Sequence, residues 1–180
     1  MARSLNEFAS IIKTRNVAAA SRFEVQVYPP PFLMNENSQM AGDSQYISIL
    51  AEMIQIPEFV LMTQPIRDTG EQREVVYDKI YPPVTATFIC DGKMDVKNFF
   101  DTWTQGAMIT SNGTFRYPAD YTANELIIVQ LDHSGKGVYQ VTLKDVYPKI
   151  VNDIPLSASS KDYNRCQVQF TYRNWVSERI

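Results

Sequence analysis

The chain has 180 residues and a formal net charge of −3, with 7 basic and 10 acidic side chains in its first ninety residues and 10 of each in its second. This length suits one domain spanning residues 1–180, large enough to bury a core without disulfides or metals. Neither half is a basic patch, which argues against ordinary phosphate-neutralising nucleic-acid binding. No apolar run approaches the ~20 residues that span a bilayer, so we expect no membrane anchor and synthesis in the cytoplasm.

The first elements in chain order are a helix, a strand and a loop. Ser4 and Glu7 fit a capping box, and the apolar residues that follow at helical spacing predict a short N-terminal amphipathic helix. Alternation over residues 22–28 predicts a half-buried strand, which three consecutive prolines end. Residues 30–43 show no periodicity, and a loop of this length is commonly functional or mobile, so this segment is a candidate contact loop.

The centre of the sequence carries apolar residues on both faces of its predicted strands. Residues 46–56 read as one strand. After the break at Pro57, residues 59–63 and 74–80 form a long hairpin closed by the charged turn 67–71. A chain of this size can cover one face of the hairpin with its own core, whereas the second face must meet water, a ligand or another copy. This surplus of apolar surface indicates assembly.

One clear helix follows among further strands. Residues 84–90 predict a β-branched strand that Asp91 and Gly92 end. The helix 96–107 has aromatic and apolar residues at three- and four-residue steps, with Asp95 as its N-cap. Because burial of such a stripe is the usual source of helix stability, we expect it to pack against the sheet.

The last third of the chain is again β. Residues 125–131 and 138–143 predict a hairpin, and we expect its second strand to end by Pro148. Alternation over residues 166–173 predicts a final strand with one face in the core. The sum is a mainly β fold, a sandwich or partly closed antiparallel barrel, with one packed α-helix and a short N-terminal helix.

Side chains suited to chemistry are few. Cys90 and Cys166 are far apart in β-like runs and read as buried thiols, with an inter-chain bridge as the alternative. The single histidine, His133, lies in a glycine-containing turn, where mobility works against the fixed geometry of a general base. We therefore predict no enzyme activity and no catalytic, metal or cofactor-binding residue.

The order of these elements, with Lys-Asp-Val-Tyr-Pro at residues 144–148 and Val-Gln-Phe-Thr-Tyr-Arg at 168–173, resembles the tail tube proteins of contractile-tailed bacteriophages. The resemblance implies hexameric rings that stack into a hollow tube, whose inner β-barrel has strands from every subunit. It implies tape measure protein and then DNA inside the tube, without specific DNA binding, and a sheath and a baseplate tube initiator as partners. It places the protein in the virion tail, made in the host bacterium. The loop 30–43 and the N-terminal helix depart from the family pattern, so no role is carried over to them.

Under this hypothesis two sets of residues serve assembly. The candidate inter-subunit wall consists of Ile47, Ile49, Met53, Phe59, Leu61, Val75 and Tyr77. The candidate lumen-facing residues are Ser48, Glu52, Glu74 and Asp78, with ordinary solvated side chains as the alternative. An acidic or neutral lumen would repel phosphate and let DNA slide.

Two other functions remain open. The first is a related assembly protein, either a baseplate tube initiator or the tube of a phage-like injection or secretion device. The second is a monomeric ligand-binding β-barrel, in which the extra apolar face of the hairpin would line a pocket.

Overall fold

Alternating apolar residues build one seven-stranded sheet with the order β1-β8-β9-β10-β5-β2, to which β11 adds by pairing with β9. The computed structural model describes residues 10, 12–13, 17–36, 42–67, 70–109, 113–159 and 161–180. The strands are β1 (Phe23–Val27), β2 (Ala51–Ile54), β3 (Val60–Ile66), β4 (Arg73–Ile80), β5 (Val84–Ile89), β6 (Met108–Ile109), β7 (Thr114–Phe115), β8 (Ala123–Leu131), β9 (Gly137–Val151), β10 (Arg165–Thr171) and β11 (Asn174–Arg179). The helices are α2 (Pro31–Glu36), α4 (Ser44–Ile49), α5 (Asp95–Gly106) and α6 (Pro118–Tyr121).

The long strand β9 joins the two halves of the sheet. Its first part pairs with β8 and β11, and its last residues pair with β10 instead. Asp145 lies between these parts with φ of 53°, a left-handed conformation that Asp tolerates better than most residues. The sheet therefore curves around a core without closing into a barrel, which confirms the predicted mainly β fold.

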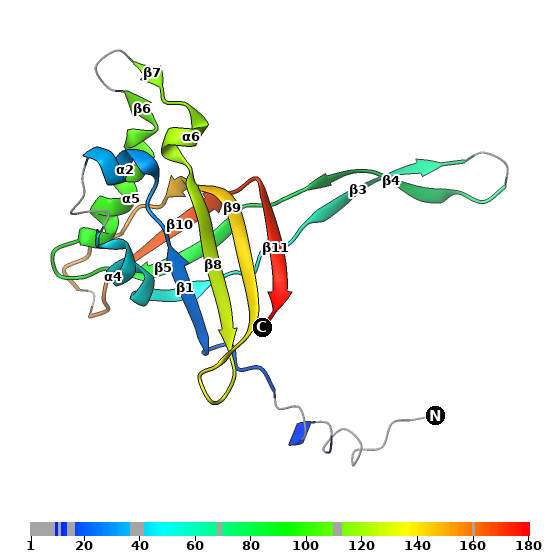
Figure 1. Cartoon of the computed structure of the whole chain (residues 1–180), viewed down its shortest axis with the longest axis horizontal. Coiled ribbons are helices and arrows are strands. Elements are labelled where there is room, and N and C mark those ends of the chain that lie inside the picture. The colour runs from blue at the N-terminus through cyan, green and yellow to red at the C-terminus, as the bar shows by residue number, and fades with distance from the viewer. Residues whose placement is uncertain are drawn as a thin grey trace.

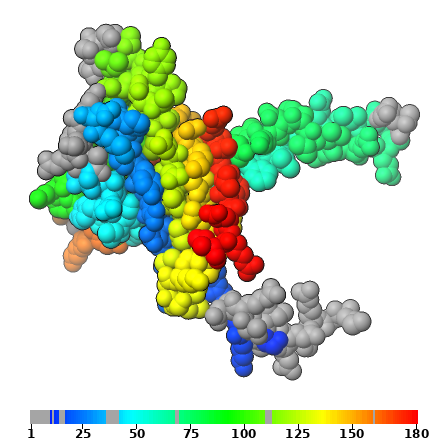
Figure 2. Space-filling model, viewed as in Figure 1, coloured from blue at the N-terminus to red at the C-terminus, as the bar shows by residue number. Residues whose placement is uncertain are grey.

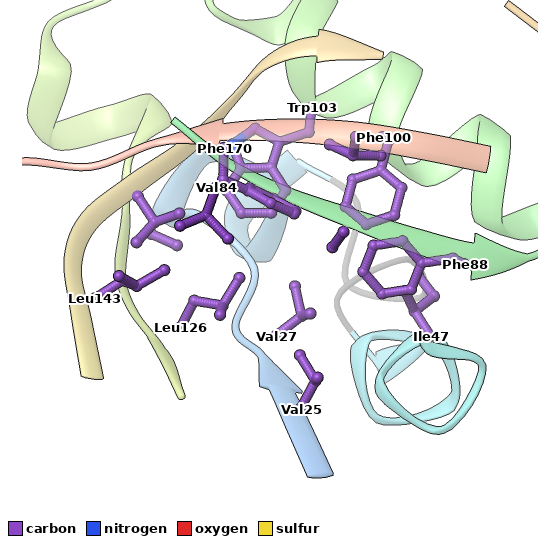
Figure 3. Packing of buried hydrophobic residues seen from close by; sticks show 14 of the residues in the cluster. Val25, Val27, Ile47, Val84, Phe88, Phe100, Trp103, Leu126, Leu143 and Phe170 are labelled. Carbon is purple, nitrogen blue, oxygen red and sulfur yellow. The ribbon is translucent and has the colours of Figure 1, made fainter. Parts of the chain in front are cut away.

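Helix α5 supplies the centre of that core. Its apolar stripe is at most 1% exposed and comprises Val96, Phe99, Phe100 and Trp103. The ring centroid of Phe100 lies 5.0 Å from that of Phe88 in β5 and 5.8 Å from that of Phe170 in β10 (Figure 3). The predicted packing of this helix against the sheet is confirmed.

The N-terminus of α5 differs from the prediction. Asp95 is the first helical residue, and the preceding Met94 makes no side-chain cap. The carboxylate of Asp91 caps the helix instead, accepting the amide hydrogen of Asp95 at 2.8 Å. Burial acts to raise the pKa of Asp91, but hydrogen bonds from backbone amides together lower it below its ordinary value.

Helix α2 covers one end of α5 at a glycine. A Cβ added to Gly106 would lie 2.2 Å from the ring of Phe32, so only glycine permits this close approach. The prediction of an irregular loop over 30–43 is thus wrong for α2, while residues 37–41 lie outside the described residues. Only Ser10, Ile12 and Lys13 of the predicted N-terminal helix are described, and they are helical.

The largest error concerns residues 46–56, which were predicted as one strand. They form the end of α4, then Leu50, and then the short strand β2. Ile47 is 0% exposed whereas Ile49 is 81% exposed, so the two residues do not share a strand face. The apolar residues of this short segment fit either periodicity, and packing of Ile47 into the core selects the helix.

Two strand predictions also need correction. Strand β9 continues through Pro148, which pairs with Phe170 beside a bulge at Lys149. Bulges are among the places where a sheet tolerates proline. Strand β11 was not predicted, because its sequence lacks the alternation of apolar and polar residues that marks a half-buried strand.

Candidate self-assembly surface

Strands β3 and β4, named here the arm, extend away from the rest of the molecule (Figure 1). Every residue of β4 is exposed, and in β3 only Met62 is partly covered. The space-filling view shows the arm standing clear of the body (Figure 2). Its exposed apolar side chains are Val60, Leu61, Ile66, Val75, Val76, Tyr77 and Ile80. The predicted hairpin is confirmed, and the protomer leaves it uncovered.

Apolar side chains occupy both faces of the arm. Residues paired across two strands share a face, and faces alternate along each strand. Leu61 and Val76 lie on one face, whereas Val60 and Val75 lie on the other. A neighbour that covered only one face would leave the other in water.

A bulge in the arm separates two predicted lumen residues. The register shifts between Met62 and Thr63, which pair with Asp78 and Val76 respectively. Thr63 Oγ1 donates to Glu74 Oε2 at 3.0 Å, so these two residues share a face. Asp78 shares the opposite face with Met62. Glu74 and Asp78 therefore point to opposite sides of the arm.

Aromatic contacts anchor the root of the arm to the end of the chain. The ring centroids of Phe59 and Trp175 lie 6.0 Å apart, as do those of Tyr81 and Tyr172. The hydroxyl of Tyr172 donates to the carbonyl oxygen of Glu58 at 3.4 Å, and burial raises the pKa of Tyr172 to about 12. These contacts hold the arm at a defined angle to the sheet.

A groove of about 740 Å³, named here the β1 groove, is lined mainly by residues of β1 and α4. Figure 1 shows these two elements on the side of the body opposite the arm. The lining residues are 23–29, Met34, Ser44, Gln45, Ser48, Ile49 and Ala51. Three of its apolar residues, Tyr28, Met34 and Ile49, are exposed to solvent. Among the lining residues that the structure describes, Glu24 carries the formal charge.

The free edge of β1 forms one wall of this groove. Leu131 donates its amide hydrogen to Arg22 O, which fixes the alternation of hydrogen bonds between β1 and β8. The backbone groups of Phe23, Val25 and Val27 therefore point away from β8. The amide of Val27 is already satisfied, since it donates to Ser48 Oγ at 2.9 Å.

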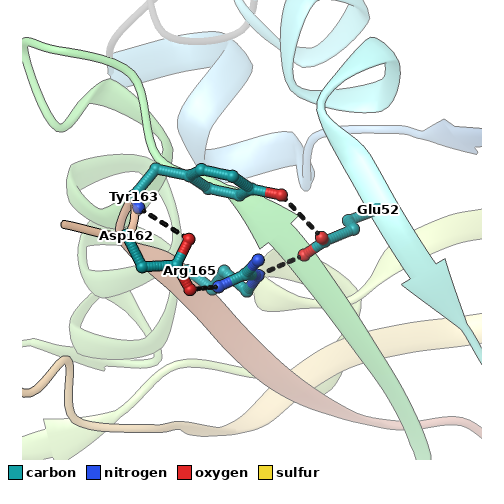
Figure 4. A network of polar contacts seen from close by, with 4 residues as sticks. All are labelled: Glu52, Asp162, Tyr163 and Arg165. Atoms are coloured by element: carbon teal, nitrogen blue, oxygen red, sulfur yellow. Dashed lines mark hydrogen bonds and ion pairs between the residues drawn. The ribbon is translucent and has the colours of Figure 1, made fainter.

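The open face of the sheet, opposite α5, is polar. Thr85 of β5 and Gln167 and Gln169 of β10 alternate with buried residues. At its margin Arg165 donates to Glu52 Oε2 and to Asp162 Oδ2, both at 2.7 Å, and the Tyr163 hydroxyl donates to Glu52 Oε1 at 3.0 Å (Figure 4). Arg165 lowers the pKa of both carboxyls, so two carboxylates offset one guanidinium at neutral pH.

The structure separates the predicted site residues into three places. Ile47 is 0% exposed, so within the protomer its side chain packs in the core and offers no surface to a neighbour. Ser48 and Ile49 lie at the β1 groove, and Glu52 and Met53 follow in β2. The arm and its root carry Phe59, Leu61, Glu74, Val75, Tyr77 and Asp78.

Sequence reasoning missed several surface residues. Val76 and Ile80 extend the apolar faces of the arm, and the same alternation would have included them. The groove residues Tyr28 and Met34 carried no such signal, because they meet Ile49 only after folding.

The side chains that the sequence singled out for chemistry are two cysteines and one histidine. Cys166 is buried and Cys90 half-buried, both are free thiols, and burial raises the pKa of Cys166 to about 12. His133 is exposed in the turn after β8. Within the described residues no cluster of three or more His, Cys, Asp or Glu side chains is placed to hold a metal ion. No helix in this part of the chain has the length and apolarity to cross a membrane.

Several solved structures have a similar fold. The tube-terminating cap of the anti-feeding prophage has a TM-score of 0.66 at 11% identity, covering 91% of this chain and 92% of that chain. The sheath-tube complex of the PVC extracellular contractile injection system gives 0.63 at 12%, covering 99% and 100%. The six-fold symmetrised baseplate of the anti-feeding prophage gives 0.61 at 16%, covering 90% and 95%. At these identities the likeness establishes the fold alone.

The fold and the matching family model together define a tube-like structural protein of a phage tail or contractile injection system. The family model described as phage tail tube protein matches residues 18–178. The chain therefore belongs to the phage tail tube protein family, as the order of its elements predicted. No curated protein sequence matches it.

Proposed function

We propose that the chain is the repeating subunit of a contractile tail tube, forming hexameric rings that stack into a hollow cylinder. The observation that carries this proposal is the arm, which is uncovered on both faces within the protomer. The role is structural and not enzymatic, and the protein acts in the tail of the virion.

The physical reason for assembly is the cost of leaving the arm in water. Fully burying one large aliphatic side chain is worth about 1.5–3 kcal/mol, and the arm exposes several of them. Unpaired strand edges also invite pairing with other chains, and a closed multi-chain wall removes both liabilities. Neighbouring copies of the same chain are the partners that every subunit of a tube meets.

The proposal includes a sheath outside the tube, a baseplate initiator and a terminator at its ends, and tape measure protein and later DNA inside it. Likeness to chains of a sheath-tube complex, a tube-terminating cap and a baseplate supports this set of partners. Family membership supports a tube that conducts DNA without specific binding.

We assign the polar open face of the sheet, including Glu52, to the lumen. Thr85, Gln167 and Gln169 contribute hydroxyl and amide groups to this face. Arg165 is offset by Glu52 and Asp162. Because Arg165 is paired with these two carboxylates, it retains a phosphate less strongly than an unpaired cation would. On the arm, at most one of Glu74 and Asp78 faces the lumen, because the bulge turns them to opposite sides.

Charge reversal tests the lumen assignment. Glu52→Lys would add a cation and remove the partner of Arg165, so we expect slower DNA ejection from particles that still assemble. Glu74→Lys and Asp78→Lys, made separately, identify which arm carboxylate faces the lumen. Unchanged ejection with Glu52→Lys would remove that residue from the lumen.

The assembly proposal is tested by light scattering after size-exclusion chromatography and by negative-stain microscopy of the purified protein. We expect rings or tubes; globular monomers under all conditions would contradict the proposal. Rings that never elongate would favour a baseplate initiator or a terminator. The monomeric ligand-binding barrel is less well supported, because the sheet does not close and the surplus apolar residues lie outside it.

A further inference from the structure

We propose that the N-terminal amphipathic helix predicted from the sequence folds back onto its own copy and covers an apolar cavity between β1 and β2. Phe8 and Ile12 are the side chains that enter this cavity. The proposed tube function gives the helix no role, and the contact does not depend on assembly.

The cavity has a volume of about 310 Å³ and lies where the two ends of the curved sheet approach each other. Among the strands that the structure describes, β1 and β2 are the first and last in the strand order and are not paired with each other. Phe23 of β1, Ile54 of β2, Ile128 of β8 and Val141 of β9 all line the cavity. It therefore opens into the edge of the apolar core.

The mouth of the cavity favours an apolar occupant. Met53 and Ile56 line it and are 48% and 55% exposed. Two of its polar lining side chains are already engaged: Glu52 pairs with Arg165, and Gln130 Nε2 donates to backbone carbonyl oxygens. An occupant would thus gain more by covering the apolar side chains than by contacting these polar ones.

The chain leads its own N-terminal helix to this mouth. Ala20 and Ser21 line the cavity, at the end of the sheet where a turn joins β8 to β9 (Figure 1). Ile12 is helical and lies eight residues before Ala20, and a chain of that length can span about 25 Å. The helix can therefore reach the cavity of its own copy.

The helix needs an apolar surface to pack against. Helices shorter than about 12–15 residues are marginal in water, and packing of an apolar face supplies most of their stability. Phe8 and Ile12 are four residues apart and share one face of the predicted helix. Ile12 is 36% exposed and Val17 is 60% exposed in the protomer. The face that carries Ile12 is thus available for a further contact.

The tether favours contact within one copy. Figure 1 shows residues 12–13, in blue, away from the sheet, so docking requires the chain between Lys13 and Ala20 to change its path. A segment joined by a short flexible linker has an effective concentration in the millimolar range near its own cavity. At lower protein concentrations the cavity of another copy competes poorly.

A photo-crosslink tests this contact in the whole chain. Phe8 is replaced by p-benzoylphenylalanine, and Ser10, which lies on the opposite face of the predicted helix, receives the same replacement as the control. Unlabelled and ¹⁵N-labelled copies are mixed before assembly, irradiated and mapped by mass spectrometry. We expect position 8 to crosslink to residues 20–23, 52–56, 128–130 or 139–141 of the same copy, and position 10 to give no crosslinks there.

A variant at the mouth tests the cavity itself. Ile56→Asp should abolish the crosslink from position 8, whereas Leu156→Asp, at a residue 79% exposed and outside the lining, should leave it intact. Crosslinks that join labelled to unlabelled copies would overturn the inference, since the helix would then cover the cavity of another copy. Crosslinks to other peptides, or none from position 8, would overturn it as well. Each of these results leaves the proposed tube function standing.

Discussion

Replacing Val76 by Asp should prevent assembly without unfolding the protomer. Val76 lies on the arm, is 52% exposed and makes no contribution to the buried core. A change there leaves the packing around α5 untouched. The substitution should therefore weaken the contacts between copies and leave the stability of each protomer unchanged.

The magnitude follows from the exposure of this side chain. Burying a whole valine is worth about 1.5–3 kcal/mol, so covering its exposed half contributes about 0.8–1.5 kcal/mol to each contact. Asp also places a carboxylate in the contact, and an unpaired buried charge costs several kcal/mol. A total above about 3 kcal/mol weakens each contact more than about 100-fold, since about 1.4 kcal/mol is tenfold.

The assay is sedimentation velocity together with thermal unfolding followed by circular dichroism. We expect Val76→Asp to sediment as a protomer under conditions in which the wild type assembles, with the unfolding midpoint of the separated protomer unchanged. Val76→Thr is the matched control, because it keeps β-branching and adds no charge.

Two results would refute the reasoning. Assembly of Val76→Asp equal to that of the wild type would mean that this part of the arm is not an interface. A clear loss of protomer stability would mean that the arm contributes to the fold, contrary to its exposure.

Four further outcomes follow from the protomer itself. Phe100→Ala should lower the free energy of unfolding by about 3–5 kcal/mol in urea, because it empties the centre of the core, whereas a loss below 1 kcal/mol would contradict the packing described. Asp91→Ala should cost about 1 kcal/mol by uncapping α5, and Asp91→Asn should recover part of it. Native Cys166 should resist iodoacetamide at pH 8, since burial raises its pKa to about 12; rapid alkylation without unfolding would refute this. Arg165 lowers the pKa of the carboxyls of Glu52 and Asp162, so Arg165→Met should be less stable than the wild type at neutral pH, and this difference should disappear as pH falls below roughly 4. A difference that persists in acid would show that packing, not charge, is responsible.

The local periodicity of apolar residues predicted much of the fold. The alternation in β10 predicted its buried face, and the stripe of α5 predicted the core, because one-sided burial selects one apolar face in each element. Periodicity was insufficient for residues 46–56, where the spacing of the apolar residues fits a helix or a strand. Contacts with the core, distant in sequence, made that choice.

The candidate self-assembly surface was likewise predictable from the sequence only in part. The sequence by itself determined that a long hairpin would have more apolar surface than one chain could cover, since both faces of its strands are apolar. Tertiary structure alone decided that the hairpin projects as an arm, because contacts between residues more than a hundred positions apart, such as Phe59 and Trp175, orient its root. It also decided where the β1 groove forms, since helix α4 and strand β1 meet only when the chain has folded.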